Sequence, residues 1–327
     1  NLTVITTTSE MFEDSFGFTQ QEVWNALEEY GLSGQKESVK AWYDGFVFGK
    51  KRDIYNPWSI INYLKMQKLS CYWANTSSNS LVGKLIREGS PAVKETMEEF
   101  LKGRKLCTTI DEQIVFSQLE YSESAVWSLF LASGYLKADS YRFNEKFGIE
   151  EYELSLTNKE VRITFEKMIR DWFGQSVKEY NGFIKALLQG NTKEMNAYMN
   201  RIALSTFSYF DTGNRPSGSE PERFYHGFVL GLMVELADRY VIISNRESGF
   251  GRYDVMLKPR KKEDDAIILE FKVYDPDDEE SLGDTVKAAL KQIEDKNYKA
   301  ALMAEGISED RIRNYGFGFE GKRVLIG

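Results

Sequence analysis

The chain has 327 residues, more than one ordinary domain holds, so we expect two or three domains. Hydrophobic residues make up 42% and aromatic residues 14%, which is enough to build cores and excludes disorder as the main state. The net charge of −8 argues against a protein that coats nucleic acid non-specifically, although it leaves room for a local basic groove. The sequence has no run of about 18 apolar residues and no leader after Asn1, so we expect no membrane span and no signal peptide, and we interpret the chain as a piece of something longer.

The scarcity of histidine and cysteine excludes several kinds of site. Cys71 and Cys107 are the only cysteines and His226 is the only histidine, too few for a tetrahedral zinc site or a disulfide framework. A Ser-His-Asp triad would depend on His226, which has no nucleophile elbow near it. The P-loop pattern GxxxxGK[ST] does not occur, so this chain does not bind ATP through a P-loop. The two cysteines indicate a reducing, cytoplasmic compartment.

Residues 1–118 are expected to be mainly helical, with short extended pieces. Thr19-Gln-Gln-Glu22 is a capping box that begins a helix. Pro57 and Pro91 each follow a capping residue, the position where proline suits a helix start.

Residues 119–215 are expected to form a helical spacer with a winged-helix-like hairpin. Apolar and polar residues alternate on both sides of Gly148, which predicts the hairpin. The helix after it carries acidic residues beside its basic ones, so a protein-contact module is favoured over a DNA-reading one. The expected elements are a helix at 124–133, strands at 135–143 and 151–156, a helix from a capping box at Thr157–Glu160 through Trp172, and two helices within 176–206.

A segment rich in glycine, serine and proline at 212–219 predicts a linker, after which 216–327 should form an α/β domain with a mixed sheet. The chain as a whole is then α+β. The elements expected in this last domain are a helix at 221–238, strands at 240–245, 251–258 and 266–274, a helix at 281–295, a strand at 298–304, a short helix at 308–314 and a strand at 315–325.

The strands around residue 262 carry the candidate chemistry. Glu270 and Lys272 are two apart on one strand, so they project from the same face. A turn centred on Lys262 pairs Asp254 with Glu270, because each lies eight residues from that centre. Apolar residues flank this pair, which is unusual for surface carboxylates. Taken alone, however, the spacing also fits an ordinary solvated hairpin.

Two carboxylates and a lysine at one place fit a metal site. Mg²⁺ or Mn²⁺ takes oxygen ligands, typically one or two carboxylates, waters and substrate phosphate oxygens. A metal lowers the pKa of bound water, and a nearby lysine can orient that water. Without a metal, Asp254 and Glu270 would repel each other.

This set resembles the signature of the PD-(D/E)xK nucleases, and its flanks resemble the bacterial proteins in which such a domain follows an AAA-ATPase-like domain. The resemblance implies a restriction-endonuclease-like fold for 216–327 and the end of an ATPase-like domain for 1–118. The segments that carry it are Val39–Gly45, Ile54–Ser59, Tyr72–Ser78, Phe224–Gly231, Ser244–Asp254, Ile268–Lys272 and Lys291–Tyr298.

The resemblance also implies roles for single residues. Asp254 and Glu270 would be metal ligands and Lys272 the catalytic lysine. The glutamate of the family's core helix corresponds best to Glu222, and the glutamine of its last helix to Gln292. Tyr253 stands where the family has proline, and the absence of a P-loop means that ATP binding is not implied.

Two functions therefore stay open. One is a metal-dependent phosphodiesterase, regulated by the ATPase-like part, that acts on DNA in the first place and on RNA as the second choice. The other is a nuclease-fold module without activity that mediates protein contacts. Residues 219–327 hold 17 Lys and Arg against 22 Asp and Glu, so polyanion binding would need an asymmetric charge distribution. A protein partner is expected at the helical half, and the oligomeric state is not predicted.

Overall fold

A computed structural model of the chain shows two compact units, Asn1–Met168 and Ile169–Gly327. It describes residues 5–73, 79–111, 118–119, 122–172, 177–210, 220–246, 253–296 and 298–327, and at 177, 205–210, 220–225, 245–246 and 253–254 it describes the backbone alone.

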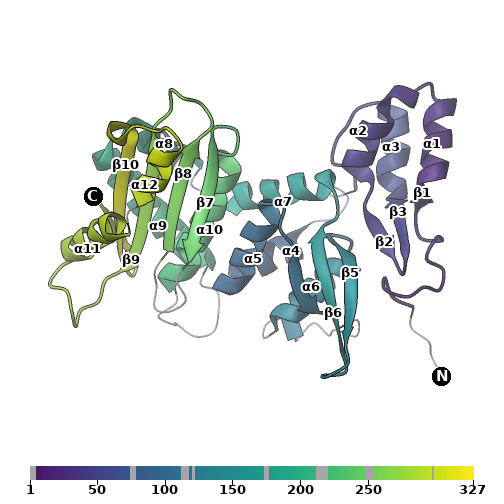
Figure 1. Ribbon diagram of the computed structural model, residues 1–327, viewed down its shortest axis with the longest axis horizontal. Coiled ribbons are helices and arrows are strands. Elements are labelled where there is room, and N and C mark those ends of the chain that lie inside the picture. Colours follow the sequence, from purple (N-terminus) through teal and green to yellow (C-terminus); the bar gives the residue numbers. More distant parts are fainter. Residues whose placement is uncertain are drawn as a thin grey trace. The chain divides into compact units, whose positions relative to one another are not determined.

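The first unit begins with three helices packed on a small antiparallel sheet of order β1-β3-β2 (Figure 1). The expected capping box is present, since Thr19 and Glu22 bond each other's backbone N–H at the start of α1. Buried aromatic and aliphatic side chains, among them Tyr43, Tyr55 and Tyr63, form the core between these helices. The elements are β1 (Phe18–Thr19), α1 (Gln20–Glu29), α2 (Lys36–Tyr43), β2 (Phe46–Phe48), β3 (Lys51–Tyr55) and α3 (Pro57–Met66), with a 3₁₀ turn at Ser33–Gln35.

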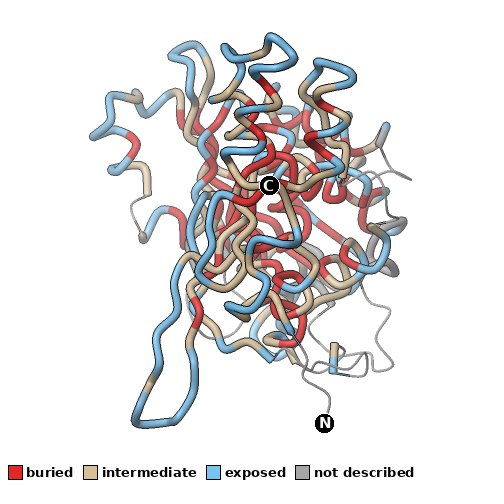
Figure 2. The backbone as a smooth tube through the Cα atoms, turned by 90° about the vertical axis from the view of Figure 1, so that its right-hand side faces the viewer, coloured by how far each residue is buried: buried red, intermediate tan, exposed pale blue. Residues whose placement is uncertain are grey.

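The rest of this unit is built around a second antiparallel sheet of order β4-β6-β5. The expected hairpin is present, and its outer end is exposed (Figure 2). Helix α6 is buried along most of its length, with Trp127 and Phe130 packed edge to face. The elements are α4 (Ser80–Glu88), α5 (Pro91–Leu101), β4 (Leu106–Thr109), α6 (Glu123–Ala132), β5 (Leu136–Asn144), β6 (Ile149–Leu156) and α7 (Lys159–Trp172).

The capping box expected at the start of α7 is wrong. Asn158 accepts the hydrogen bond from the backbone N–H three residues on, so it is the capping side chain. The hydroxyl of Thr157 donates instead to the carbonyl of Gly134 at 2.7 Å. Glu160 turns inward, is buried, and accepts a hydrogen bond from Ser59 at 2.8 Å. A carboxylate that ties α7 to α3 in the core is not available to cap the helix.

The second unit contains a five-stranded mixed sheet of order β11-β10-β9-β8-β7. Strands β7, β8 and β9 are antiparallel neighbours, β9 and β10 are parallel, and β10 and β11 form an antiparallel hairpin. The elements are α8 (Val177–Gln189), α9 (Thr192–Phe210), α10 (Glu220–Glu235), β7 (Tyr240–Arg246), β8 (Tyr253–Pro259), β9 (Ala266–Val273), α11 (Leu282–Asp295), α12 (Tyr298–Ala304), a 3₁₀ turn (Glu309–Arg311), β10 (Ile312–Glu320) and β11 (Arg323–Ile326).

Helices cover both faces of this sheet. Successive side chains of β9 point to opposite faces, so alternate residues contact different helices. Ala266 and Ile268 pack with Ile293 of α11. Phe271 points to the opposite face, where aromatic rings from α8, α10 and β10 meet. These rings are buried, and the Phe271 and Phe317 centroids are 4.8 Å apart. Even-numbered residues of β9 therefore face α11, and Glu270 and Lys272 belong to that set.

Two asparagines of α9 complete the edge of the sheet at β11. The Asn196 amide donates to the carbonyl of Ile326 and accepts from its N–H, both at 2.8 Å. Asn200 does the same with Val324, at 2.7 and 3.0 Å. Val324 and Ile326 are alternate residues whose backbone groups point away from β10. The side-chain amides therefore occupy the place that a further strand would take.

Three expectations for the last hundred residues are wrong. Residues 298–304 form helix α12 rather than a strand. At 308–314 the structure has a short 3₁₀ turn, and β10 already begins at Ile312. The single strand expected at 315–325 is the hairpin β10–β11, which turns at Gly321 with φ +55°. The other strands and helices expected after residue 216 are present within a few residues.

The expected linker at 212–219 lies outside the described residues, so the three-domain division at 118 and 215 stays a prediction. Pairing between β4 and β6 joins strands from both sides of residue 118. None of the helices in the described part of the chain is both long and apolar enough to cross a bilayer.

Candidate active site

The backbone of β8 and β9 has the register that the turn predicts. Asp254 lies opposite Glu270, within an unbroken antiparallel ladder from Tyr253–Phe271 to Leu257–Ile267. Asp254 also pairs with Asn245 of β7. The side chain of Asp254 is outside the described part, so its position is known from the backbone alone.

Glu270 is a carboxylate in the interior of the unit, with 0% of its surface exposed. The Nε2 amide of Gln292, itself 8% exposed, donates a hydrogen bond to Oε1 of Glu270. Gln292 lies on the buried stripe of α11, between Ala289 and Ile293. The structure thus brings together two of the residues that the sequence indicated, and the helix glutamine fixes the orientation of the strand glutamate.

Two glycines on β10 permit this contact. Gly316 pairs with Glu270 and Gly318 with Lys272. A Cβ on Gly316 would lie 2.7 Å from the carbonyl oxygen of Val286 in α11, and one on Gly318 would also be crowded by that helix. Helix α11 therefore lies directly against β10 beside Glu270. Sequence reasoning missed these residues, although a Gly-x-Gly alternation inside a strand is a sign of close backbone approach.

For the remaining candidate residues the structure gives the strand or helix on which each one lies. Lys272 is half-buried and shares the face of Glu270. Glu222 lies in α10, where only its backbone is described. His226, one turn further on, is 2% exposed, so it belongs to the interior of the unit. The structure therefore brings Glu270 and Gln292 into contact, places Lys272 on the same face of β9, and gives only the backbone of Asp254 and Glu222.

The chemistry of this residue set fits a hard divalent cation. A buried carboxylate and a second carboxylate residue at the paired position offer oxygen ligands, which Mg²⁺ and Mn²⁺ prefer. Within the described residues, no three Asp, Glu, His or Cys side chains converge on one point. Mg²⁺ usually keeps waters and substrate oxygens among its ligands, so two carboxylates are enough to hold it.

One comparison with known proteins bears on this site. Residues 220–327 match a family model described as the PD-(D/E)XK nuclease superfamily. That segment contains α10, the whole five-stranded sheet and all five candidate residues. No curated protein and no solved structure matched the chain. The resemblance of the upstream part to an AAA-ATPase-like domain stays a prediction.

Proposed function

We propose that the chain is a metal-dependent phosphodiesterase that cleaves nucleic acid, with DNA as its substrate rather than RNA. The observation that supports this most is the pairing of Asp254 with a fully buried Glu270, and Lys272 follows on the same face. The pairing occurs inside the segment that matches the nuclease superfamily. Opposed residues of an antiparallel pair share a face of the sheet, so this register suits two ligands of one metal.

Each residue then has a distinct role. Asp254 and Glu270 hold Mg²⁺ or Mn²⁺, which supplies charge neutralisation at the phosphate and a more acidic water. Gln292 keeps the Glu270 carboxylate in one orientation through its hydrogen bond. Lys272 orients the attacking water and offsets negative charge as it develops on the phosphate. Glu222 of α10 is included as the residue that corresponds to the core-helix glutamate of the family.

DNA binding requires positive charge near this site despite the acidic total. Lys291 is exposed on α11 next to Gln292, whereas the exposed Lys261 and Lys262 lie in the β8–β9 turn, at the other end of these strands from Asp254 and Glu270. Lys258 is less available, because it forms an ion pair with Glu305. The acidic loop at 275–280 would have to lie away from the bound strand, since like charges repel.

The upstream unit is proposed to regulate the nuclease through protein contacts. Its sheet order β4-β6-β5, with α6 before the hairpin, agrees with a winged-helix-like arrangement. Helix α6 contains no lysine or arginine and is largely buried, so it is unsuited to reading a DNA groove. The same proposal includes that this unit binds a protein partner, that it is related to an AAA-ATPase-like domain, and that the protein works in the cytoplasm.

Cleavage of supercoiled and single-stranded DNA with Mg²⁺ or Mn²⁺ tests the function. We expect Lys272→Ala to abolish cleavage and to keep metal binding, measured by calorimetry. Glu270→Gln and Asp254→Asn should weaken metal binding, because each removes a charged ligand. Matched controls are Lys287→Ala and Glu294→Gln, two exposed positions on α11 that should leave both properties unchanged.

The outcomes separate the two functions. Equal cleavage by the wild type, Lys272→Ala and Asp254→Asn would place the activity elsewhere or in a contaminant. Absence of cleavage by the wild type with either metal, together with intact folding, would favour the binding module without activity. Metal binding that Glu270→Gln does not change would remove the proposed centre.

A further inference from the structure

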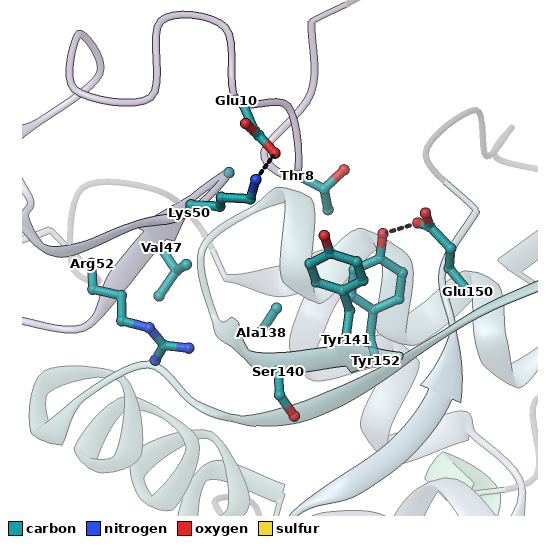
Figure 3. Close-up of a pocket in the computed structure, with 11 residues that line it drawn as sticks. Thr8, Glu10, Val47, Lys50, Arg52, Ala138, Ser140, Tyr141, Glu150 and Tyr152 are labelled. Atoms are coloured by element: carbon teal, nitrogen blue, oxygen red, sulfur yellow. Dashed lines mark hydrogen bonds and ion pairs between the residues drawn. The ribbon is translucent and has the colours of Figure 1, made fainter. Parts of the chain in front are cut away.

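The first unit contains a pocket of about 440 Å³ whose walls come from three separate stretches of chain (Figure 3). One wall is the N-terminal segment with Glu10, the second is the β2–β3 hairpin with Lys50 and Arg52, and the third is the β5–β6 hairpin with Tyr141 and Glu150. This volume lies in the usual range for small-ligand sites. All of these residues belong to one compact unit, so the pocket does not depend on the candidate active site.

A β-bulge creates the aromatic wall. The register of β5 against β6 shifts between Ala138 and Ser140, so Asp139 is an extra residue in that strand. After the bulge, Tyr141 rather than Ser140 pairs with Tyr152. The two rings lie 5.9 Å apart with their planes tilted by 30°. Since side chains alternate in a strand, one extra residue moves Tyr141 onto the pocket face.

The bulge also fixes one of the cations. The guanidinium of Arg52 donates a hydrogen bond to the carbonyl oxygen of Asp139, the bulged residue. Arg52 is thereby held at the pocket wall opposite the tyrosines, as Figure 3 shows. Lys50, the second cation, forms an ion pair with Glu10 at 2.6 Å, and both side chains are more than 60% exposed. Such an exposed pair contributes little stability, so an anionic ligand can replace Glu10 at low cost.

The tyrosines differ in what they offer a ligand. Tyr152 is 8% exposed and donates its hydroxyl to Oε2 of Glu150 at 2.5 Å. Tyr141 is 56% exposed, so its ring is available for stacking. Glu150 is itself exposed, and a carboxylate has acceptor capacity beyond one hydrogen bond. The pocket therefore combines an accessible ring, a carboxylate acceptor beside it and two cations across from it.

We propose that this pocket binds a guanine nucleotide carrying a 5′-phosphate. The base stacks on Tyr141, its adjacent N–H groups donate to Glu150, and the phosphate contacts Lys50 and Arg52. Guanine presents two neighbouring donors on that edge, whereas adenine presents an acceptor nitrogen that a carboxylate repels. The nucleotide can be free or part of a single strand, because both present the same groups.

Calorimetric titration of the full chain in EDTA tests the proposal, since chelation removes any metal-dependent binding at the candidate active site. We expect GMP to bind at least tenfold more tightly than AMP, guanosine or inorganic phosphate. Tyr141→Ala and Lys50→Ala should each weaken GMP binding about tenfold or more. Glu150→Gln should reduce the preference for GMP over AMP, because an amide both donates and accepts.

Matched controls and a second ligand sharpen the result. Phe147→Ala and Lys51→Ala change exposed residues of the same two hairpins outside the pocket wall, and they should leave GMP binding unchanged. Circular dichroism checks that each variant folds. An oligothymidylate with one central dG should bind more tightly than GMP if the site takes a strand, and less tightly if it takes the free nucleotide.

The proposal is overturned if GMP does not bind, if GMP and AMP bind equally, or if Tyr141→Ala binds GMP as the wild type does. Binding that Glu270→Gln abolishes would instead place the nucleotide at the candidate active site. None of these results depends on whether the chain cleaves DNA, so failure of this site and failure of the nuclease proposal are distinguishable.

Discussion

The two asparagines that complete the edge of β11 allow a quantitative prediction. Asn196→Ala removes two hydrogen bonds to Ile326, and Asn200→Ala removes two to Val324. The net value of a hydrogen bond is about 1 kcal/mol, so each substitution should lower the free energy of unfolding of this unit by about 2 kcal/mol. The double variant should lose about 4 kcal/mol, with some deviation because both side chains bind one strand.

Hydrogen exchange measured by mass spectrometry or NMR reports on this edge directly. The amides of Val324 and Ile326 donate to the asparagine side chains, so their exchange should accelerate about 30-fold when 2 kcal/mol is lost. Asn196→Asp removes the donor and sets a carboxylate against a carbonyl oxygen, so at neutral pH it should destabilise at least as much as alanine. Asn62→Ala is the control, since this half-buried amide donates to the Trp58 carbonyl of its own helix, and it should change stability by less than about 0.5 kcal/mol.

The asparagines do not stabilise this edge if Asn196→Ala and Asn200→Ala both unfold within about 0.5 kcal/mol of the wild type and the amides of Val324 and Ile326 exchange at unchanged rates. In that case water would satisfy the backbone of β11 as well as the asparagines do. A loss confined to Asn200→Ala would mean that only the middle of the strand needs a partner.

Three other perturbations follow from single contacts. Gly316→Ala should lower the melting temperature measurably, because its Cβ would lie 2.7 Å from a carbonyl oxygen of α11 and must push that helix from the sheet. Burial alone would raise the pKa of Asp265, but hydrogen bonds from Arg313 and Arg311 outweigh it and lower that pKa. This ion-pair stability is present at neutral pH and lost as pH falls below about 4, so Asp265→Asn should destabilise more at pH 7 than at pH 3 in urea melts. Thr19→Ala removes the cap of α1 and should cost about 1 kcal/mol in the same assay.

The part of the candidate site that depends on neighbouring residues in the sequence could be predicted, and the part that depends on packing between distant elements could not. The register of Asp254 and Glu270 follows from a short hairpin, in which the turn fixes every pair. The contact between Glu270 and Gln292 depends instead on how closely α11 approaches β10. Gly316 decides that distance, and its effect appears only when strand and helix are packed together. The family resemblance indicated Gln292, but the spacing of residues could not.

The errors near the end of the chain have two physical causes. Within 298–304 the run Lys-Ala-Ala-Leu-Met-Ala consists of strong helix formers. The expectation of a strand there is wrong because this high helix propensity decides the local structure. In 312–320 long-range pairing decides the outcome, because β10 lies parallel to β9 over eight residue pairs. The helix expected at 308–314 therefore stops before Ile312, where the pairing with β9 begins. The turn at Gly321 was visible as glycine between two alternating runs and was missed.

The asparagines of α9 show that the segment matched by the family model is shorter than the segment needed to complete the sheet. The family match begins at residue 220, but the partners of β11 lie about twenty residues before it. A fragment cut at the start of the match would present β11 as an open strand, ready to add a strand from another molecule. We expect such a fragment to associate and a fragment from residue 169 to stay dispersed. A fragment expressed to study this unit should therefore include α9, whose asparagines bond the backbone of β11.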